Sequence, residues 1–500
     1  MKKTTILLLL CLLHTMAGFS QGSIRLTLND ALKLAQEQSL QTFLNKHYYM
    51  ADYWAYRSFK ADLLPSVSIR ANPLTYSNAS QLRYNSIDRV DEFIRTENLR
   101  SDLNLNVSQK IAATGGTFSM QSELGRIENY GNNEYTQYSS RPFTISYQQA
   151  LFGFNAMKWQ RKIEPLLFEK AKKEYLESTE KMHLTTIRYF FGLVSAAIQM
   201  EIAQTNMENT EKLLKVAHSR FELGTVSREE LLDLRLSNNN AQIDLQQAGL
   251  NYREAKENLL NFLMLPIDVE LETEIPENTP VIEVDIQLVL QKALENNPEI
   301  LQLDQSILES QRNVEQANRA RHFQADVNVS YGVSKDDGNF LKSGDLKAVY
   351  TPEFESYQQL SLGINIPILD WGRRKGQYEM AKSRHEIAQV SGRQSLQQFK
   401  QNAVTRAIAF NIQKSRVESA ALSDTLANES YELTMTRFST GQADVLRLTS
   451  SQNAKDNARF RYINALADYW TNYYTLRQLT LFDFEKNSNI EFDEEEILKK

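Results

Sequence analysis

The side chains that could carry chemistry in this sequence are six histidines, many carboxylates and one cysteine. Metal sites on helices often place two histidines four residues apart, and no two histidines here have that spacing. The sequence also contains no glycine-rich phosphate loop and no nucleophile elbow. Its carboxylates lie in segments of helical periodicity, where they are typical of solvated helix faces. We therefore expect no enzyme activity, no metal and no cofactor.

The first 20 residues have the composition of a secretory signal peptide. Lys2 and Lys3 precede an apolar run from Ile6 to Leu13, and Gly18-Phe19-Ser20 supplies small residues for cleavage before residue 21. The run is far shorter than the ~20 residues of a membrane-spanning helix. Cys11 lies inside it, so the mature chain is expected to hold no thiol and no disulfide. A net charge of −6 without a basic run argues against a nucleic-acid partner.

The elements that would position any site come in two similar halves. Arg220-Phe221-Glu222-Leu223-Gly224 recurs as Arg437-Phe438-Ser439-Thr440-Gly441, at an offset of 438 − 221 = 217 residues. The same offset relates Ser227 to Asp444, two residues that favour the start of a helix. In each half a strand-like segment lies 70 residues before the Arg-Phe-x-x-Gly turn, which corresponds to about 100 Å of helix at 1.5 Å per residue. Such a helix must pack on other helices to bury its apolar side chains.

The periodicity predicts two structural repeats followed by a tail. The first repeat, 21–282, contains a helix, β-strands with an extra hairpin near 101–125, a long helical hairpin at 155–265 and a linker at 266–282. The second repeat, 283–480, contains a helix, a β-hairpin at 326–369 and a long helical hairpin at 372–479. The acidic, aperiodic tail, 481–500, is expected to be disordered.

The two repeats differ in length between the first strand and the long helix. Val67 aligns with Val327 at an offset of 260, whereas the helices align at 217, so the first half holds 260 − 217 = 43 extra residues. The hairpin between Leu103 and Leu124 is the candidate for this insertion. If the strands belong to a membrane barrel, this hairpin either adds strands to the barrel or packs beside it near its periplasmic rim.

The predicted strands have one apolar and one polar face. Val67, Ile69 and Ala71, for example, alternate with Ser66, Ser68 and Arg70. A soluble sandwich would bury the apolar face, whereas a transmembrane barrel would turn it to lipid and the polar face to a wet lumen. Four to six strands cannot close a wide barrel, and lipid does not tolerate an unpaired sheet edge. A membrane-embedded form would therefore require strands from several copies.

Taken together, the ordered features of the chain resemble those of the TolC-like outer-membrane efflux proteins, or outer membrane factors. The features are the signal peptide, the tandem repeat, the strand-to-helix corner Pro367-Ile368-Leu369-Asp370-Trp371-Gly372 and the paired Arg-Phe-x-x-Gly turns, and the resemblance covers Leu28 to Leu479. It implies a mainly α fold with β, in which long α-helical hairpins form a trimeric α-barrel tunnel and the strands form a shared transmembrane β-barrel. The usual barrel of the family has twelve strands per trimer.

The resemblance also implies a function and partners. The protein would be a homotrimer in the outer membrane of a Gram-negative bacterium, with its helical part in the periplasm. It would serve as exit duct of a tripartite efflux pump or type I secretion system. Its partners would be a periplasmic adaptor (membrane fusion) protein, an inner-membrane transporter of the RND or ABC type, and outer-membrane lipid.

Site residues follow from the same resemblance. The periplasmic tips that dock the adaptor would comprise Phe221, Leu223, Gly224, Thr225, Phe438, Thr440, Gly441 and Gln442. Six residues past each tip glycine, the family narrows the tunnel with acidic residues. Glu230 matches this pattern and Arg447 departs from it. We expect either a closed aperture held partly by Glu230–Arg447 ion pairs in the trimer, or a solvated Arg447.

A second class of protein also has long helical hairpins, namely a periplasmic coiled-coil adaptor or structural protein without a channel. Adaptors carry glycine-rich, lipoyl-like β-domains and lack long amphipathic strands. Here the strands flank the long helices within each repeat. This arrangement favours the channel.

Overall fold

The computed structural model describes residues 24–85, 88–130, 134–224, 226–276, 280, 282–342, 345–350, 353–440 and 442–498. The chain divides into two compact units. Unit 1 contains the residues up to Ala51, Ala171–Ile300 and the residues from Ser395 onward. Unit 2 contains Asp52–Lys170 and Leu301–Gln394.

Two long helical hairpins occupy equivalent places in the two halves of the chain. The first consists of α4 (Ala156–Glu222) and α5 (Arg228–Phe262), the second of α8 (Arg373–Ser439) and α9 (Val445–Thr480). Both α4 and α8 are 67 residues long, and each helix of the second hairpin begins 217 residues after its equivalent. The shorter partners begin at side-chain caps, because the Ser227 hydroxyl and the Asp444 carboxylate accept hydrogen bonds from backbone N–H groups of the first turn.

In unit 2 the helices form a single layer. The C-terminal part of α3 (Leu40–Asp62) packs on α4, α4 contacts α7 (Pro298–Arg321), and α7 contacts α8. Three contacts establish this order. The rings of Tyr56 and Phe168 stack with their centroids 4.5 Å apart. Trp159 Nε1 donates to Glu315 Oε2 at 2.9 Å, and Ser310 Oγ and His385 Nδ1 form a hydrogen bond of 2.8 Å. The outer helices of the layer are therefore α3 and α8.

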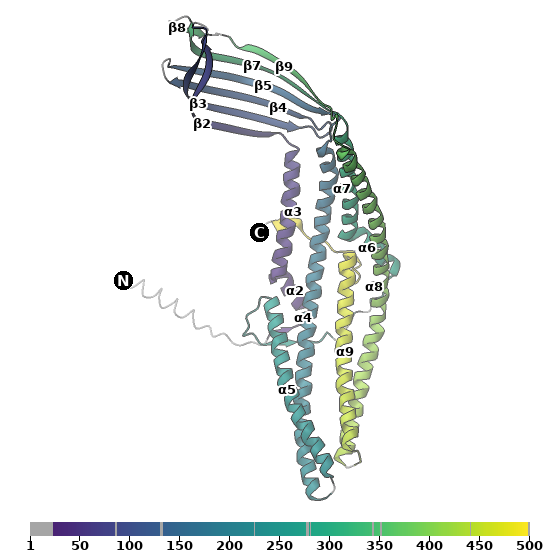
Figure 1. Ribbon diagram of the computed structural model, residues 1–500. Coiled ribbons are helices and arrows are strands. Elements are labelled where there is room, and N and C mark those ends of the chain that lie inside the picture. Colours follow the sequence, from purple (N-terminus) through teal and green to yellow (C-terminus); the bar gives the residue numbers. More distant parts are fainter. Residues whose placement is uncertain are drawn as a thin grey trace, which may run out of the picture. The chain divides into compact units, whose positions relative to one another are not determined.

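The strands of unit 2 belong to one antiparallel sheet (Figure 1). Its order is β2-β3-β4-β5-β7. Both β8 and β9 pair with the edge of β7 that faces away from β5, each with a different segment of β7. The strands are β2 (Ser66–Asn85), β3 (Val90–Lys110), β4 (Thr117–Tyr130), β5 (Tyr135–Leu151), β7 (Gln324–Lys342), β8 (Asp345–Tyr350) and β9 (Glu355–Asn365).

The extra hairpin of the first half lies within this sheet. β3 pairs with β2 on one side and with β4 on the other, and β4 in turn pairs with β5. β3, its turn and β4 run from Val90 to Tyr130, which accounts for most of the 43-residue insertion. In the structure the inserted strands thus lie within the sheet of a single chain.

Unit 1 surrounds the largest apolar core of the described chain. Two short helices, α2 (Leu28–Gln38) and α6 (Ile286–Asn296), pack on the long ones, and β1 (Ile24–Leu26) pairs in parallel with β6 (Leu271–Thr273). The predicted linker thus contains a strand. Fully buried core side chains include Ile187, Phe190, Leu259, Leu260, Phe410, Leu466, Tyr469 and Tyr473.

The tail after α9 differs from the expectation of disorder. It forms β10 (Phe482–Asp483), β11 (Ser488–Asn489) and α10 (Glu494–Leu498). Phe492 packs on the rings of Tyr49 and Tyr175, with centroids 5.2 and 4.8 Å away. The acidic composition suggested a solvated segment, but the few apolar residues in it find buried partners on α3 and α4, and these contacts order the tail.

Candidate functional site

The part of the sheet in which β2 begins and β9 ends has two chemically distinct faces. Residues directly opposite each other on neighbouring strands lie on the same face. One row of such partners across the sheet is apolar and consists of Val67, Val107, Met120, Ile145 and Tyr331. Many apolar side chains of this face are exposed, among them Ile69, Leu105, Met120, Leu362 and Ile364. An exposed apolar face of this extent marks a site of interaction with another protein or with a membrane.

The opposite face is polar. A row of serines crosses the first five strands of the order and comprises Ser66, Ser108, Ser119, Ser146 and Ser330. The hydroxyls of Ser66 and Ser108 lie 2.8 Å apart and those of Ser119 and Ser146 lie 2.6 Å apart, so they hydrogen-bond across strands. Such a face suits contact with water.

Charged groups lie farther along the polar face and are paired. Glu123 lies between Arg141, at 2.9 Å, and Arg100, at 4.0 Å. Asp102 is 3.8 Å from Arg100. Positive and negative side chains thus alternate in this part of the polar face, whereas the serine row is uncharged.

The first helical turn predicted as a tip closes at Gly224. Its φ of +71° is a left-handed conformation that glycine adopts without strain, and its N–H donates to the Phe221 carbonyl at 3.0 Å. Leu223 is 78% exposed, and Phe221 is 39% exposed. Thr225 lies outside the described residues. The turn therefore presents apolar side chains to solvent.

The second tip is less apolar on its surface. Phe438 is buried against Tyr431 and Leu448, whereas Thr440 and Gln442 are exposed. The Gln442 N–H donates to the Arg437 carbonyl at 2.8 Å and closes the turn. Gly441 lies outside the described residues. Although the two turns are related by the repeat, only the first exposes its phenylalanine.

The two tips lie side by side in unit 1. Arg220 of the first donates to the Ser439 carbonyl of the second at 3.4 Å. A shallow pocket of about 340 Å³ lies between them, and Arg220, Glu230, Phe438, Gln442 and Asp444 are among its lining residues. The structure thus brings Glu230 together with residues of both predicted tips.

The two predicted aperture residues have different local roles. The Glu230 carboxylate accepts the Ser227 N–H at 2.8 Å and completes a capping box at the start of α5. The Arg447 N–H donates to Asp444 at 2.7 Å, while its side chain is exposed. Within the described chain no hydrogen bond or ion pair joins the side chains of Glu230 and Arg447.

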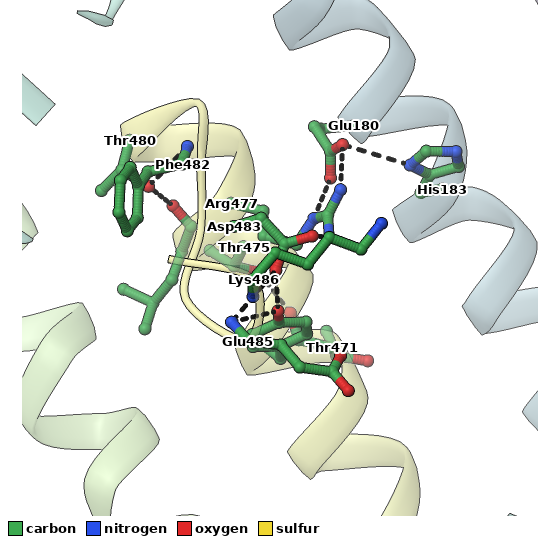
Figure 2. A network of polar contacts seen from close by, with 12 residues as sticks. Glu180, His183, Thr471, Thr475, Arg477, Thr480, Phe482, Asp483, Glu485 and Lys486 are labelled. Atoms are coloured by element: carbon green, nitrogen blue, oxygen red, sulfur yellow. Dashed lines mark hydrogen bonds and ion pairs between the residues drawn. The ribbon is translucent and has the colours of Figure 1, made fainter. Parts of the chain in front are cut away.

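Unit 1 contains a buried ion-pair network that was not predicted from the sequence (Figure 2). Arg477 on α9 makes two hydrogen bonds of 3.0 Å to Glu180 on α4 and one of 2.6 Å to Asp483 in the tail. The Tyr473 hydroxyl donates to Asp483 at 2.9 Å, and His183 lies 3.4 Å from Glu180. The Glu180 side chain is only 1% exposed. The single signal in the sequence is an arginine within an aromatic run, which is not specific.

The network sets the ionisation of its carboxylates. Burial by itself would raise the pKa of Glu180, but the adjacent His183 ring and the hydrogen-bonded Arg477 guanidinium outweigh it, so this pKa lies below its ordinary value. Burial likewise opposes ionisation of Asp483, and the charge of Arg477 with backbone N–H donors lowers its pKa overall. Burial and the adjacent Asp483 raise the pKa of Tyr473, and burial raises that of Tyr474 to about 12. Both carboxylates are therefore charged and paired at neutral pH.

In the part of the chain that the structure describes, no group of three or more histidine, cysteine, aspartate and glutamate side chains is arranged to hold a metal ion. None of the helices described has the apolar length needed to cross a lipid bilayer.

The fold has close counterparts among solved structures. The Campylobacter jejuni CmeC outer membrane channel aligns over 94% of this chain and 88% of its own, with a TM-score of 0.65 and 15% identity. The outer membrane protein VceC from Vibrio cholerae aligns over 93% and 97%, with a TM-score of 0.61 and 12% identity. The Neisseria gonorrhoeae MtrE outer membrane channel, in its open state, aligns over 91% and 88%, with a TM-score of 0.53 and 15% identity. At these identities the likeness shows the fold, and the predicted TolC-like fold is confirmed.

Sequence comparison points the same way. No curated protein matches the chain. Residues 289–480, which cover the second repeat, match the model of a family described as outer membrane efflux protein. The second repeat is thus similar in sequence to the outer membrane efflux proteins, and the chain has the TolC-like fold of the outer-membrane channels over 94% of its length.

Proposed function

We propose that this protein is the outer-membrane exit duct of a tripartite efflux pump or type I secretion system. The observation that carries the proposal is the two-faced sheet of unit 2. Its apolar face is exposed, its polar face bears hydrogen-bonded serines, and its strands are 11 to 21 residues long, apart from the six-residue β8. Strands of about 10 residues suffice to cross a bilayer. The sheet would lie in the outer membrane with its apolar face toward lipid, and the helices would extend into the periplasm.

The active form in this proposal is a homotrimer. On α5, the exposed apolar residues Leu232, Leu236, Ile243 and Leu250 follow the heptad spacing of helices that pack side by side. On α8, Leu422, Leu426 and Leu433 form a second exposed stripe of similar spacing. Two different stripes on one chain suit a head-to-tail ring, in which α5 of one copy packs on α8 of the next.

The tips would dock the adaptor in this assembly. Leu223 and Phe221 offer exposed apolar side chains at the first turn, and Thr440 and Gln442 offer polar ones at the second. The adaptor would in turn connect the duct to an inner-membrane transporter of the RND or ABC type. Leu223→Asp should abolish co-purification with the adaptor while leaving the trimer intact, with Glu222→Asp as the conservative neighbour. Undiminished adaptor capture by Leu223→Asp would exclude the first tip as a docking site.

The channel itself is tested by cell fractionation and by conductance. The mature protein should be recovered with outer membranes and should conduct ions when reconstituted in a planar lipid bilayer. The competing function, a periplasmic adaptor, predicts recovery in the soluble periplasm and no conductance. A water-soluble monomer without conductance would refute the proposed function.

The aperture is the part of the duct where charge would matter most. In the trimer, Arg447 of one copy would pair with Glu230 of a neighbour and hold the resting tunnel closed. Arg447→Glu would place six carboxylates there and should raise cation conductance through mutual repulsion. Arg447→Ala should give an intermediate increase. Unchanged conductance in both variants would mean that Arg447 is a solvated helix residue.

A further inference from the structure

The sheet of unit 2 has two open edges. In the described residues β2 pairs only with β3, and β8 and β9 pair only with β7. Because β8 and β9 pair with successive segments of the same edge of β7, they act together as one edge strand. The sheet is therefore six strands wide. An open edge leaves a row of unpaired N–H and C=O groups, which lipid does not tolerate.

The two inserted strands carry the same faces as their neighbours. Val107 of β3 and Met120 of β4 are opposite partners, and they connect Val67 of β2 with Ile145 of β5 in one apolar row. Ser108 and Ser119 continue the serine row in the same way between β2 and β5. A hairpin that packed outside a barrel would not need this match. The pattern indicates that β3 and β4 separate the same two solvents as the other strands.

We propose that three copies close these edges against one another, β9 of one copy against β2 of the next, into a barrel of eighteen strands instead of the twelve usual for the family. This inference rests on the membrane-embedded homotrimer of the proposed function. Strand direction permits it. Six consecutive strands alternate in direction, so the last strand of one copy runs antiparallel to the first strand of the next.

The circumference of the helical layer agrees with eighteen strands. Each copy brings four helices to the layer of unit 2, and twelve helices at 8–10 Å spacing make a ring of about 96–120 Å. Eighteen strands about 4.8 Å apart and tilted by about 40° have a circumference of roughly 113 Å, whereas twelve strands have one of roughly 75 Å. The eighteen-stranded barrel thus has about the same circumference as the helical ring that it continues. Its backbone diameter would be about 36 Å, in the range of barrels with an aqueous channel.

The sequence of β2 indicates where closure takes place. Pro73 lacks an N–H and cannot take part in a continuous ladder. It lies at an irregularity, where the register between β2 and β3 shifts between Asn72 and Thr75. The segment from Ser66 to Asn72 has no such interruption. We therefore place the principal contact of β2 with the neighbouring β9 in this segment.

Lipid exposure of the inserted strands tests the proposal. Cys11, in the predicted signal peptide, is the single cysteine of the sequence, so single cysteines can be placed in the mature protein. Leu105→Cys on β3, Met120→Cys on β4 and Ile364→Cys on β9 would carry a fluorophore in vesicles that contain nitroxide-labelled lipid. All three labels should be quenched, because all three positions lie on the outward face of an eighteen-stranded barrel. Ser119→Cys, on the opposite face, should escape quenching and react with a charged, water-soluble thiol reagent.

The two ways of failing are distinguishable. Quenching at Ile364→Cys without quenching at Leu105→Cys and Met120→Cys would place the inserted hairpin outside the barrel and overturn the eighteen-stranded form. Absence of quenching at all three positions would remove the sheet from the membrane and overturn the proposed function as well.

Closure is tested by disulfide formation. Ser68→Cys on β2 would be combined in turn with a cysteine at each position of β9 between 355 and 365. At least one combination should give a covalent trimer on denaturing electrophoresis, and each single cysteine variant should remain monomeric there. If every combination remains monomeric after oxidation, β2 and β9 are not neighbours in the assembly, and the proposal is wrong.

Discussion

At the scale of the residue, Arg477 links three segments that are distant in the sequence. It joins Glu180 on α4 and Asp483 in the tail from its own position on α9, and its side chain is 14% exposed. Removing one partner of a buried ion pair leaves an uncompensated charge, whereas an exposed pair contributes little. The network therefore stabilises unit 1 mainly because both of its buried carboxylates are paired with Arg477.

Loss of Arg477 should destabilise the protein strongly. Arg477→Ala would remove the guanidinium that pairs with two buried carboxylates and should lower the free energy of unfolding by about 3–5 kcal/mol. The control is Arg25→Ala, which breaks an exposed pair with Glu272 (side chains 82% and 63% exposed) and should cost about 1 kcal/mol or less. Guanidinium unfolding followed by circular dichroism measures both. Equal costs would show that the network adds nothing beyond a surface pair.

The same residues predict a pH dependence. The pKa values of Glu180 and Asp483 lie below the ordinary 4.5 and 3.8. The folded state thus binds fewer protons than the unfolded state, so the stabilisation is present above about pH 4.5 and is lost as the pH falls through the lowered pKa values. The difference in melting temperature between wild type and Arg477→Ala should therefore shrink below pH 4. The difference for Arg25→Ala should be small at every pH, and parallel curves for both variants would contradict the prediction.

At the scale of the element, the tips and the tail show how single positions decide where a helix ends and what it contacts. Gly224 ends α4 because it adopts a positive φ. Gly249, by contrast, lies inside α5, and a Cβ there would meet nothing within 4 Å. The same substitution should have opposite effects at the two glycines.

Gly224→Ala should weaken the first tip, because a left-handed conformation costs a non-glycine residue about 1–2 kcal/mol. Gly249→Ala should instead stabilise the protein by about 0.5–1 kcal/mol, since alanine is the better helix former. Amide hydrogen exchange at residues 219–230 reports the first effect, and thermal unfolding reports the second. The prediction would be wrong if amide exchange at the tip became faster in Gly249→Ala but not in Gly224→Ala.

The tail contacts give a second prediction at this scale. Adjacent tyrosines on α3 differ in burial, with Tyr49 at 2% exposure and Tyr48 at 69%. Tyr49→Ala removes the ring that packs on Phe492 and should cost about 3–5 kcal/mol, as expected for a large buried ring. It should also make the chain between 484 and 498 sensitive to protease. Tyr48→Ala should leave the tail protected, and equal cleavage in both variants would show that this packing does not hold the tail.

At the scale of the whole molecule, the exposed stripe on α5 determines assembly in our proposal. Ile243→Asp places a charge in the middle of the stripe and should convert the trimer to monomers in detergent. Gln242→Asp adds the same charge at the next, polar and exposed position and should leave the trimer intact. Light scattering coupled to size-exclusion chromatography measures the mass of each. A trimeric Ile243→Asp variant would place the interface elsewhere.

The sequence by itself determined the tandem repeat, the long helices and the strands with two chemically different faces. These features depend on local periodicity and on caps such as Ser227 and Asp444, which act within a few residues. The TolC-like fold followed from their order along the chain. The family pattern also identified Glu230 as a candidate site residue.

Only the tertiary structure decided the features that depend on contacts between distant segments. It placed the inserted β3 and β4 inside the sheet, because strand pairing joins residues whose separation no local pattern encodes. It also joined Glu180 to Arg477 across 297 residues and ordered the acidic tail on Tyr49. Burial of this kind exists only once helices from both halves of the chain are packed together, and this is why periodicity alone indicated neither the ion-pair network nor the folded tail.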